Sequence, residues 1–225
     1  MNTFDKNKTL GLPTTYRTIK ARSEGQYKEK GSRFIGIVAR CEDKDEAKGL
    51  LDQWRKEHHQ ARHLCWAYRF GIEHDEYRMN DDGEPSNSAG APILGQIQSF
   101  DLTNVLIGVV RYYGGTKLGV GGLINAYRTA AKSAVENGTI ITETVKDRFH
   151  LYFDYADMPH IMNDVKENNA EIRTQRFEHN CYLRIAIKIK ETSNLQEKLK
   201  KYNTLKIEKI GIFSHCENTD SPIYL

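Results

Sequence analysis

Hydrophobic and polar positions divide the first part of the chain into alternating strands and helices. Residues 43–59 have apolar positions at helical spacing and acidic residues at their beginning, as the helix dipole favours. Residues 104–113 form the most hydrophobic run of the chain, which predicts a central strand. The pattern predicts strands at 34–40, 63–71 and 104–113, and helices at 43–59, 91–100 and 123–138. Residues 72–78 continue the second strand either as an edge or as a loop.

From about residue 146 the pattern of hydrophobic and polar positions changes. The pattern there predicts the order β-α-β-β-α-β, over residues 148–155, 158–169, 170–178, 181–190, 193–202 and 205–213. This order is typical of a ferredoxin-like domain. We therefore expect an α+β protein with an open sheet in each of two domains. The expected organisation is a flexible lead at 1–15, an N-terminal domain at 16–145, a C-terminal domain at 146–213 and a tail at 214–225.

Composition places the chain among ordinary globular proteins. The 225 residues are 39% hydrophobic and 28% charged, and no apolar run approaches the roughly 18 residues that a membrane helix needs. The N-terminus lacks the apolar core of a secretory signal, so we expect a cytoplasmic protein that does not enter a membrane. The four scattered cysteines predict reduced, mostly buried thiols.

Positive charge is concentrated locally, although the formal net charge is only +3. Residues 17–40 carry seven Lys or Arg against two Glu, and residues 184–209 carry eight against three. In the second region Arg184, Lys188 and Lys190 stand at even offsets, so a strand would place them on one face. That face is either the solvated side of a half-buried sheet or a surface that contacts RNA.

A glycine-rich segment, GGTKLGVGG at 114–122, follows the central strand. With the residues just before it, this segment is our main candidate for a phosphate-binding site. Cations can pair with phosphates, tyrosines can stack on unpaired bases, and glycines let backbone N–H groups approach an anion. A helix beginning near Gly121 or Gly122 would direct its positive end at that anion. The alternative is that the glycines form a tight connection from the strand to the helix and that the tyrosines fill the core. The candidate phosphate-binding residues are Lys28, Lys30, Arg33, Arg111, Tyr112, Tyr113, Gly114, Gly115, Lys117, Gly121 and Gly122.

An acidic cluster lies in the polar loop at 81–90. Asp81, Asp82 and Glu84 could hold Mg²⁺ or supply a general base. They could equally pair with Arg33 or Arg111 and order the loop, and the neighbouring Gly and Pro suit a structural turn. We expect no cofactor, metal or catalytic residue, with Mg²⁺ and these three carboxylates as the alternative.

Four segments carry a family resemblance. They are KEKGSRFIG (28–36), ARHLCWAY (61–68), DDGEPSNSAGAPIL (81–94) and VVRYYGGTKLGVGGLINAY (109–127). Together they resemble the YigZ/IMPACT family, and the resemblance extends over about residues 17–212. It implies an N-terminal domain similar to the second domain of a small-subunit ribosomal protein. It also implies a C-terminal module similar to the last domain of elongation factor G.

The resemblance further implies a cytoplasmic protein linked to translation or RNA binding. Our leading expectation is a translation-associated regulator that binds RNA, the ribosome or another phosphate-bearing ligand. One alternative is a Mg²⁺-dependent enzyme acting on a phosphorylated small molecule or nucleotide. Another is a protein-interaction module with a partner in the translation machinery.

Overall fold

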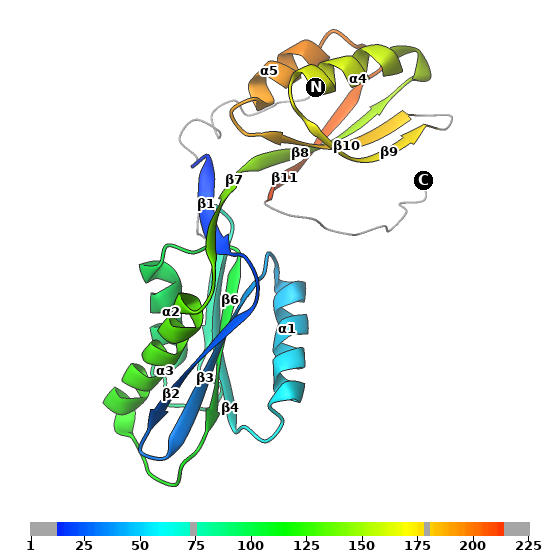
Figure 1. The fold of residues 1–225 in the computed structure, drawn as a ribbon. Helices are drawn as coiled ribbons and strands as arrows, with labels where there is room; N and C mark the ends of the chain where they lie inside the picture. Colours follow the sequence, from blue (N-terminus) through cyan, green and yellow to red (C-terminus); the bar gives the residue numbers. More distant parts are fainter. Residues whose placement is uncertain (1–12, 73–75, 178–180, 214–225) are drawn as a thin grey trace. The chain divides into compact units, whose positions relative to one another are not determined.

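The chain forms two compact units, one on each side of the Glu143–Thr144 peptide bond. The computed structural model describes residues 13–72, 76–177 and 181–213 (Figure 1). Helices and antiparallel sheets are found in both units, which confirms the predicted α+β class. None of the helices in these residues is long and apolar enough to span a membrane.

A five-stranded antiparallel sheet is the centre of the first unit. Its order is β2-β3-β6-β4-β5, with α1 on one face and α2 and α3 on the other (Figure 1). A separate two-stranded sheet pairs β1 with β7. The strands are β1 (Thr15–Ile19), β2 (Ser23–Glu29), β3 (Ser32–Arg40), β4 (His63–Phe70), β5 (Glu76–Asn80), β6 (Val105–Tyr112) and β7 (Ile140–Thr144). The helices are α1 (Lys44–Glu57), α2 (Gly90–Ser99) and α3 (Gly119–Glu136).

Each face of this sheet has its own hydrophobic core. On the α1 face, Trp54 packs with Leu106 and Val110. On the opposite face, Phe34 and Ile107 pack with Tyr127 of α3. Residues Val105–Arg111 of β6 are all buried because this strand lies in the middle of the sheet under helices on both sides. This confirms the prediction of a central strand.

The second unit has the predicted order β-α-β-β-α-β, with a short 3₁₀ turn, η1 (Tyr155–Asp157), after its first strand. Its four strands are antiparallel in the order β11-β8-β10-β9. Alternate residues of β8 and β10 form a core with both helices, so α4 and α5 cover one face of the sheet. The elements are β8 (Lys146–Phe153), α4 (Met158–Glu167), β9 (Glu171–Phe177), β10 (Cys181–Lys188), α5 (Thr192–Leu199) and β11 (Lys206–Phe213).

Several elements differ from the pattern-based prediction. Strands β1, β2 and β7 were not predicted, and Thr15, placed in the flexible lead, begins β1. β5 is an edge strand that begins within residues 72–78, where an edge or a loop was expected. Helix α3 begins at Gly119, not near Gly121 or Gly122. Lys190 lies beyond the end of β10 and therefore does not share its face with Arg184 and Lys188. The predicted tail at 214–225, and residues 1–12 of the lead, lie outside the described residues.

The cysteines at 41, 65 and 181 are free and buried, as expected for reduced core thiols. Burial is the largest cause that raises the pKa of both the Cys41 and the Cys65 thiol. Because only the thiolate reacts with iodoacetamide, we expect these thiols to be unmodified in the native protein at pH 8 and modified in denaturant. Peptide mass spectrometry after alkylation measures this. Rapid native modification of Cys65 would contradict the buried environment.

Candidate functional site

The acidic loop after β5 is ordered by its own first carboxylate. Asp81 Oδ1 accepts hydrogen bonds from the backbone N–H groups of Ala89, at 2.9 Å, and Gly90, at 2.8 Å. Its other oxygen accepts from the N–H of Asn87 at 2.9 Å. The first N–H groups of a helix have no intrahelical partner, and a negative charge is favourable there. Asp81 is therefore the cap of α2, supplied from the preceding loop.

Asp82 attaches the same loop to α1 and β4. Its Oδ2 accepts from Arg55 Nη2 and from the backbone N–H of Leu64, both at 2.7 Å. Its carbonyl oxygen lies 2.7 Å from His63 Nδ1. The backbone of Asp82 has a φ of 42° and that of Gly83 a φ of 85°, so the chain turns sharply here. The turn directs Glu84 inward.

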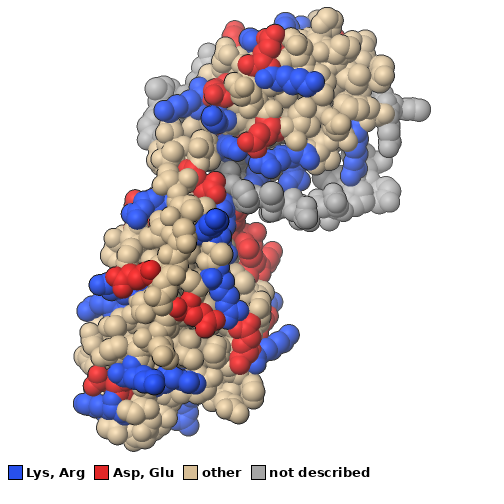
Figure 2. Space-filling model, in the orientation of Figure 1, with Lys and Arg blue, Asp and Glu red and all other residues tan. Residues whose placement is uncertain are grey.

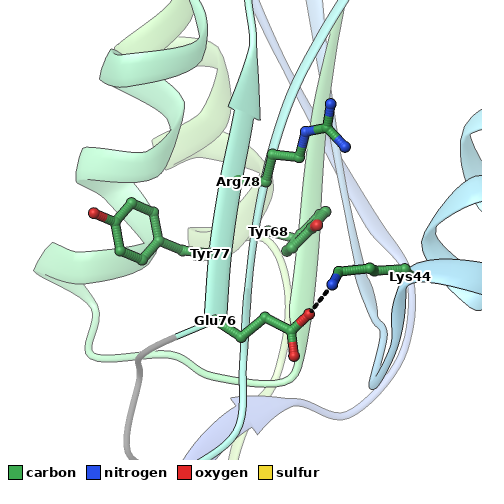
Figure 3. A pocket seen from close by; sticks show the side chains of 5 residues that line it. All are labelled: Lys44, Tyr68, Glu76, Tyr77 and Arg78. Carbon is green, nitrogen blue, oxygen red and sulfur yellow. Dashed lines mark ion pairs between the residues drawn. The ribbon is translucent and has the colours of Figure 1, made fainter.

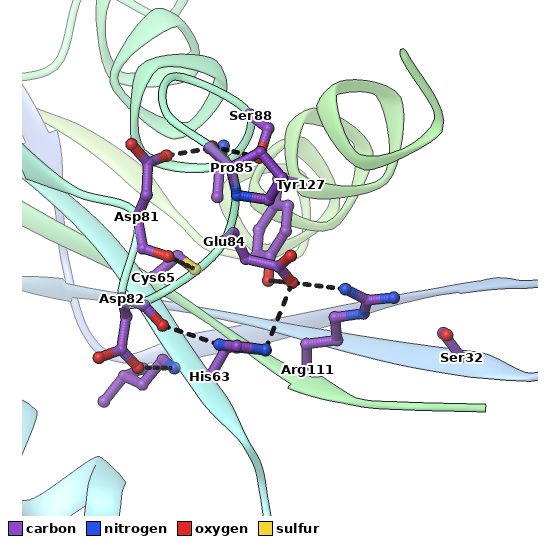
Figure 4. A network of polar contacts seen from close by, with 12 residues as sticks. Ser32, His63, Cys65, Asp81, Asp82, Glu84, Pro85, Ser88, Arg111 and Tyr127 are labelled. Carbon is purple, nitrogen blue, oxygen red and sulfur yellow. Dashed lines mark hydrogen bonds and ion pairs between the residues drawn. The ribbon is translucent and has the colours of Figure 1, made fainter. Parts of the chain in front are cut away.

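Glu84 is the centre of a buried polar network (Figure 4). Its Oε1 accepts from Arg111 Nη1 at 2.6 Å and from the Tyr127 hydroxyl at 2.8 Å. His63 Nε2 lies 4.0 Å from the same oxygen. Burial is the main cause that raises the pKa of Tyr127, so its phenol stays protonated and donates. The side chains of Glu84 and Arg111 are only 5% and 7% exposed.

The three carboxylates are thus engaged with the protein's own donors. This geometry favours the ordering role over the Mg²⁺ or general-base alternative, because a ligand would have to displace a backbone cap or a buried ion pair. Within residues 13–72, 76–177 and 181–213, no cluster of three or more His, Cys, Asp or Glu is placed to hold a metal ion.

The predicted binding segment is divided between the two faces of the sheet. Arg111 lies opposite Phe34 and faces the α2–α3 side, where its guanidinium is 5.4 Å from the Tyr113 ring. Tyr112 faces the α1 side, where Arg33 lies over its ring at 4.6 Å and His58 Nδ1 is 2.9 Å from its hydroxyl. Arg111 and Tyr112 therefore do not present one common surface to a ligand.

The hairpin between β2 and β3 lies against the glycine-rich segment. Lys30 and Gly31 have φ angles of 45° and 80°, as in a two-residue turn of type I′. Gly114 packs on the backbone of Gly31 so closely that a Cβ there would overlap it, and its N–H donates to Ser32 Oγ at 3.1 Å. This contact brings Lys30 and Arg33 to the same end of the sheet as Lys117.

The segment from Tyr113 to Lys117 is exposed and leads into α3. Leu118 precedes that helix without a side-chain cap, and no acidic residue lies in its first turn. A Cβ at Gly115, Gly119 or Gly121 would meet no atom within 4 Å, so the backbone here is accessible. Among the described residues, neither Lys30 nor Lys117 forms an ion pair, nor do Lys28 and Arg33. The first turn of α3 is thus an open anion-binding geometry near Lys30 and Lys117, whereas Arg33 lies on the α1 side of the sheet.

A shallow hollow of about 430 Å³ lies elsewhere, on the α1 side of the β4–β5 edge (Figure 3). The ion pair between Lys44 and Glu76, at 2.8 Å, spans part of it. Its other lining residues are Tyr68, Tyr77 and Arg78, so it contains none of the predicted site residues.

Sequence reasoning did not identify Tyr127 or His63 as members of the network. Tyr127 lies on the apolar face of α3 with Leu123 and Ala130, where a buried hydroxyl requires a partner. That requirement was the available signal. For His63 the sequence offered no such signal, because its place across from Arg111 depends on the register of β4 against β6.

Comparison with known proteins finds a matching family model and several similar proteins. The family model "Impact N-terminal domain" matches residues 30–135. The chain is 31% identical to IMPACT family member YvyE of Bacillus subtilis, over 81% of this chain and 84% of that protein. It is 30% identical to IMPACT family member YigZ of Escherichia coli, over 81% and 91%.

A solved structure described as that of a hypothetical protein has the same fold. It superimposes with a TM-score of 0.71 at 28% identity, and the match covers 89% of this chain and 99% of the other. The family model lies within the first unit, while the relatives and the solved structure extend over both units. The chain belongs to the IMPACT family.

Proposed function

We propose that the protein is a cytoplasmic, translation-associated regulator that binds RNA or the ribosome through the phosphate backbone. The proposed binding surface, called here the basic loop surface, consists of Lys30, the segment 113–117 and the first turn of α3. Arg33 lies on the opposite face of the sheet, over Tyr112, and is not part of this surface. The carrying observation is that Lys30 and Lys117 have no ion-pair partner among the described residues, next to a helix N-terminus that no side chain caps. The link to translation rests on the family resemblance.

Electrostatics support a phosphate ligand at this surface. Backbone N–H groups and unpaired cations favour a polyanion, and each phosphate contact releases counterions. Tyr113 is 48% exposed and adjoins Arg111, so it can add stacking on a base. Arg111 itself is held by Glu84, and in this proposal it orders the surface and does not contact the phosphate. The similarity of the first unit to a ribosomal-protein domain stays part of the proposal.

The charge of Lys30 can be removed without disturbing the hairpin, which allows a direct test of RNA binding at the basic loop surface. Asn is preferred over Lys at positions of positive φ in a type I′ turn, so Lys30→Asn removes a charge without weakening the hairpin. We expect Lys30→Asn with Lys117→Gln to weaken RNA binding and to make the negative slope of log K against log salt shallower by about 1.4 to 1.8. Fluorescence anisotropy with labelled RNA over a salt series measures both quantities.

The matched control removes two exposed lysines from other surfaces, Lys48 on α1 and Lys132 near the end of α3. Lys48→Gln with Lys132→Gln makes the same change in net charge. It should leave the slope at the wild-type value. Equal slopes for both double variants and the wild type, in folded proteins, would remove the basic loop surface from the proposal.

A further inference from the structure

The second unit has a sheet face that α4 and α5 do not cover. Residues directly opposite each other in antiparallel strands share a face, and the register pairs Tyr182 with Tyr152 and Arg184 with His150. The intervening residues Phe149 and Leu151 point into the helical core. The face that carries His150, Tyr152 and Tyr182 is called here the helix-free face.

Three aromatic rings form a cluster on the two central strands of this face. The Tyr152 and Tyr182 ring centroids are 5.2 Å apart, and the His150 ring lies 5.3 Å from Tyr182 and 6.2 Å from Tyr152. All three side chains are partly exposed. Burial and then the charge of Arg184 lower the pKa of His150, so its ring is neutral at physiological pH. A polar-edged aromatic cluster on the solvent side of a sheet contributes little to a core, which leaves it available to a ligand.

Positive charge surrounds this cluster. The register places six cationic side chains and two carboxylates on the helix-free face: Lys146, Arg148, Arg176, Arg184, Lys188 and Lys206, with Glu171 and Glu208. Lys206 lies over the Tyr152 ring at 5.8 Å. Figure 2 shows Lys and Arg side chains along the side of this unit that lies away from α4 and α5. The excess of cations over carboxylates is complementary to a polyanion.

We propose that the helix-free face binds an unpaired nucleic-acid strand, with Tyr152 and Tyr182 stacking on bases and the surrounding cations pairing with phosphates. Aromatic rings on the central strands of a four-stranded sheet are a known solution for stacking successive bases. An unpaired strand offers both phosphates for the cations and flat bases for two adjacent rings, whereas a membrane surface or an acidic protein offers no bases to stack on. This inference does not depend on the basic loop surface of the first unit.

The full-length chain with Tyr152→Leu and Tyr182→Leu tests the inference. Leucine keeps apolar contacts with neighbouring side chains but cannot stack as a ring does. The probes are a labelled single-stranded oligouridine about ten nucleotides long, the oligodeoxyuridine of equal length, and a duplex RNA. We expect affinity for the unpaired strands to fall on the order of tenfold or more, with duplex affinity unchanged. The stronger of the two single strands distinguishes RNA from DNA as the natural ligand.

A matched control replaces a tyrosine of the same unit that lies outside the sheet. Tyr155 in η1 is 62% exposed, and Tyr155→Leu should bind every probe as the wild type does. Unchanged affinity of the Tyr152/Tyr182 variant for both single strands would overturn the inference. An equal loss with the Tyr155 variant or with duplex RNA would overturn it as well.

Photocrosslinking of the wild-type protein gives a readout that does not depend on a variant folding. Oligouridine containing 4-thiouridine should crosslink to peptides of β8 or β10, and crosslinks confined to the first unit would overturn the inference. The experiments can refute each of the two proposed binding surfaces independently of the other. Lys30→Asn with Lys117→Gln should weaken duplex and single-stranded RNA alike, while the tyrosine variant weakens only the unpaired strands.

Discussion

Replacing Arg111 with methionine should lower the free energy of unfolding by about 3–5 kcal/mol. The guanidinium is the one cation that contacts the Glu84 carboxylate among the described residues, and both side chains are almost fully buried. Without it, the Tyr127 hydroxyl at 2.8 Å is the one remaining hydrogen-bond donor to Glu84 within the described part of the chain, and His63 Nε2 lies 4.0 Å away. A buried carboxylate without a countercharge is strongly unfavourable.

Denaturant unfolding followed by tryptophan fluorescence measures this loss, because both tryptophans, Trp54 and Trp66, belong to the first unit. Arg111→Met with Glu84→Gln removes both charges and should cost clearly less than the sum of the single changes. Arg128 on the exposed side of α3 provides the control, and Arg128→Met should change stability by less than about 0.5 kcal/mol. A loss below about 1 kcal/mol for Arg111→Met would contradict a structural role for the ion pair.

Replacing Trp54 with alanine should also cost about 3–5 kcal/mol. The indole is fully buried between α1 and the sheet and fills the space over Gly108. A Cβ at Gly108 would lie 2.8 Å from two atoms of the Trp54 ring, so the glycine and the indole are complementary in shape. Truncation leaves a cavity that the rigid sheet cannot close.

Unfolding of the Trp54 variant can be followed by the fluorescence of Trp66. Gly108→Ala tests the same contact from the other side and should cost about 1–3 kcal/mol by overpacking. Tyr77, which is 57% exposed on β5, is the control, and Tyr77→Ala should change stability by less than about 0.5 kcal/mol. A similar small effect for Trp54→Ala would show that α1 is not anchored through this side chain.

The strands missed or left undecided in the first unit have physical reasons for being inconspicuous in the sequence. β5 is an edge strand of only five residues, all exposed. Its polar and apolar residues alternate, but the run is short and has no buried position, so the signal is weak. β2 is the other edge, and its buried position is Gly25, where a Cβ would overlap the backbone of α3 at Ala134. Close contact of a helix with a strand selects glycine there, and glycine lowers the hydrophobic signal on which the prediction depends.

The site was predictable in its parts but not in its assembly. The alternative that Glu84 pairs with Arg111 is confirmed, whereas the capping of α2 by Asp81 needed the tertiary path of the loop. The period of two in a strand already implied that Arg111 and Tyr112 face opposite sides. That argument was applied to Arg184 and Lys188, which do share a face, but not to the segment at 111–113.

Ligand binding at the basic loop surface stays a prediction, as does binding at the helix-free face. Both rest on features that the sequence shows only partly. Contact between the Lys30–Gly31 turn and Gly114 joins segments more than eighty residues apart in the chain. The aromatic cluster similarly required the register of β8 against β10.

The most direct test of the account is the affinity of the full-length wild-type protein for RNA over a salt series. Fluorescence anisotropy with labelled single-stranded and duplex RNA provides it without any variant. The account predicts binding to both at low salt, with log K falling linearly as log salt rises. If the protein fails to bind one or both of these RNAs at the lowest salt concentration, the result contradicts the account.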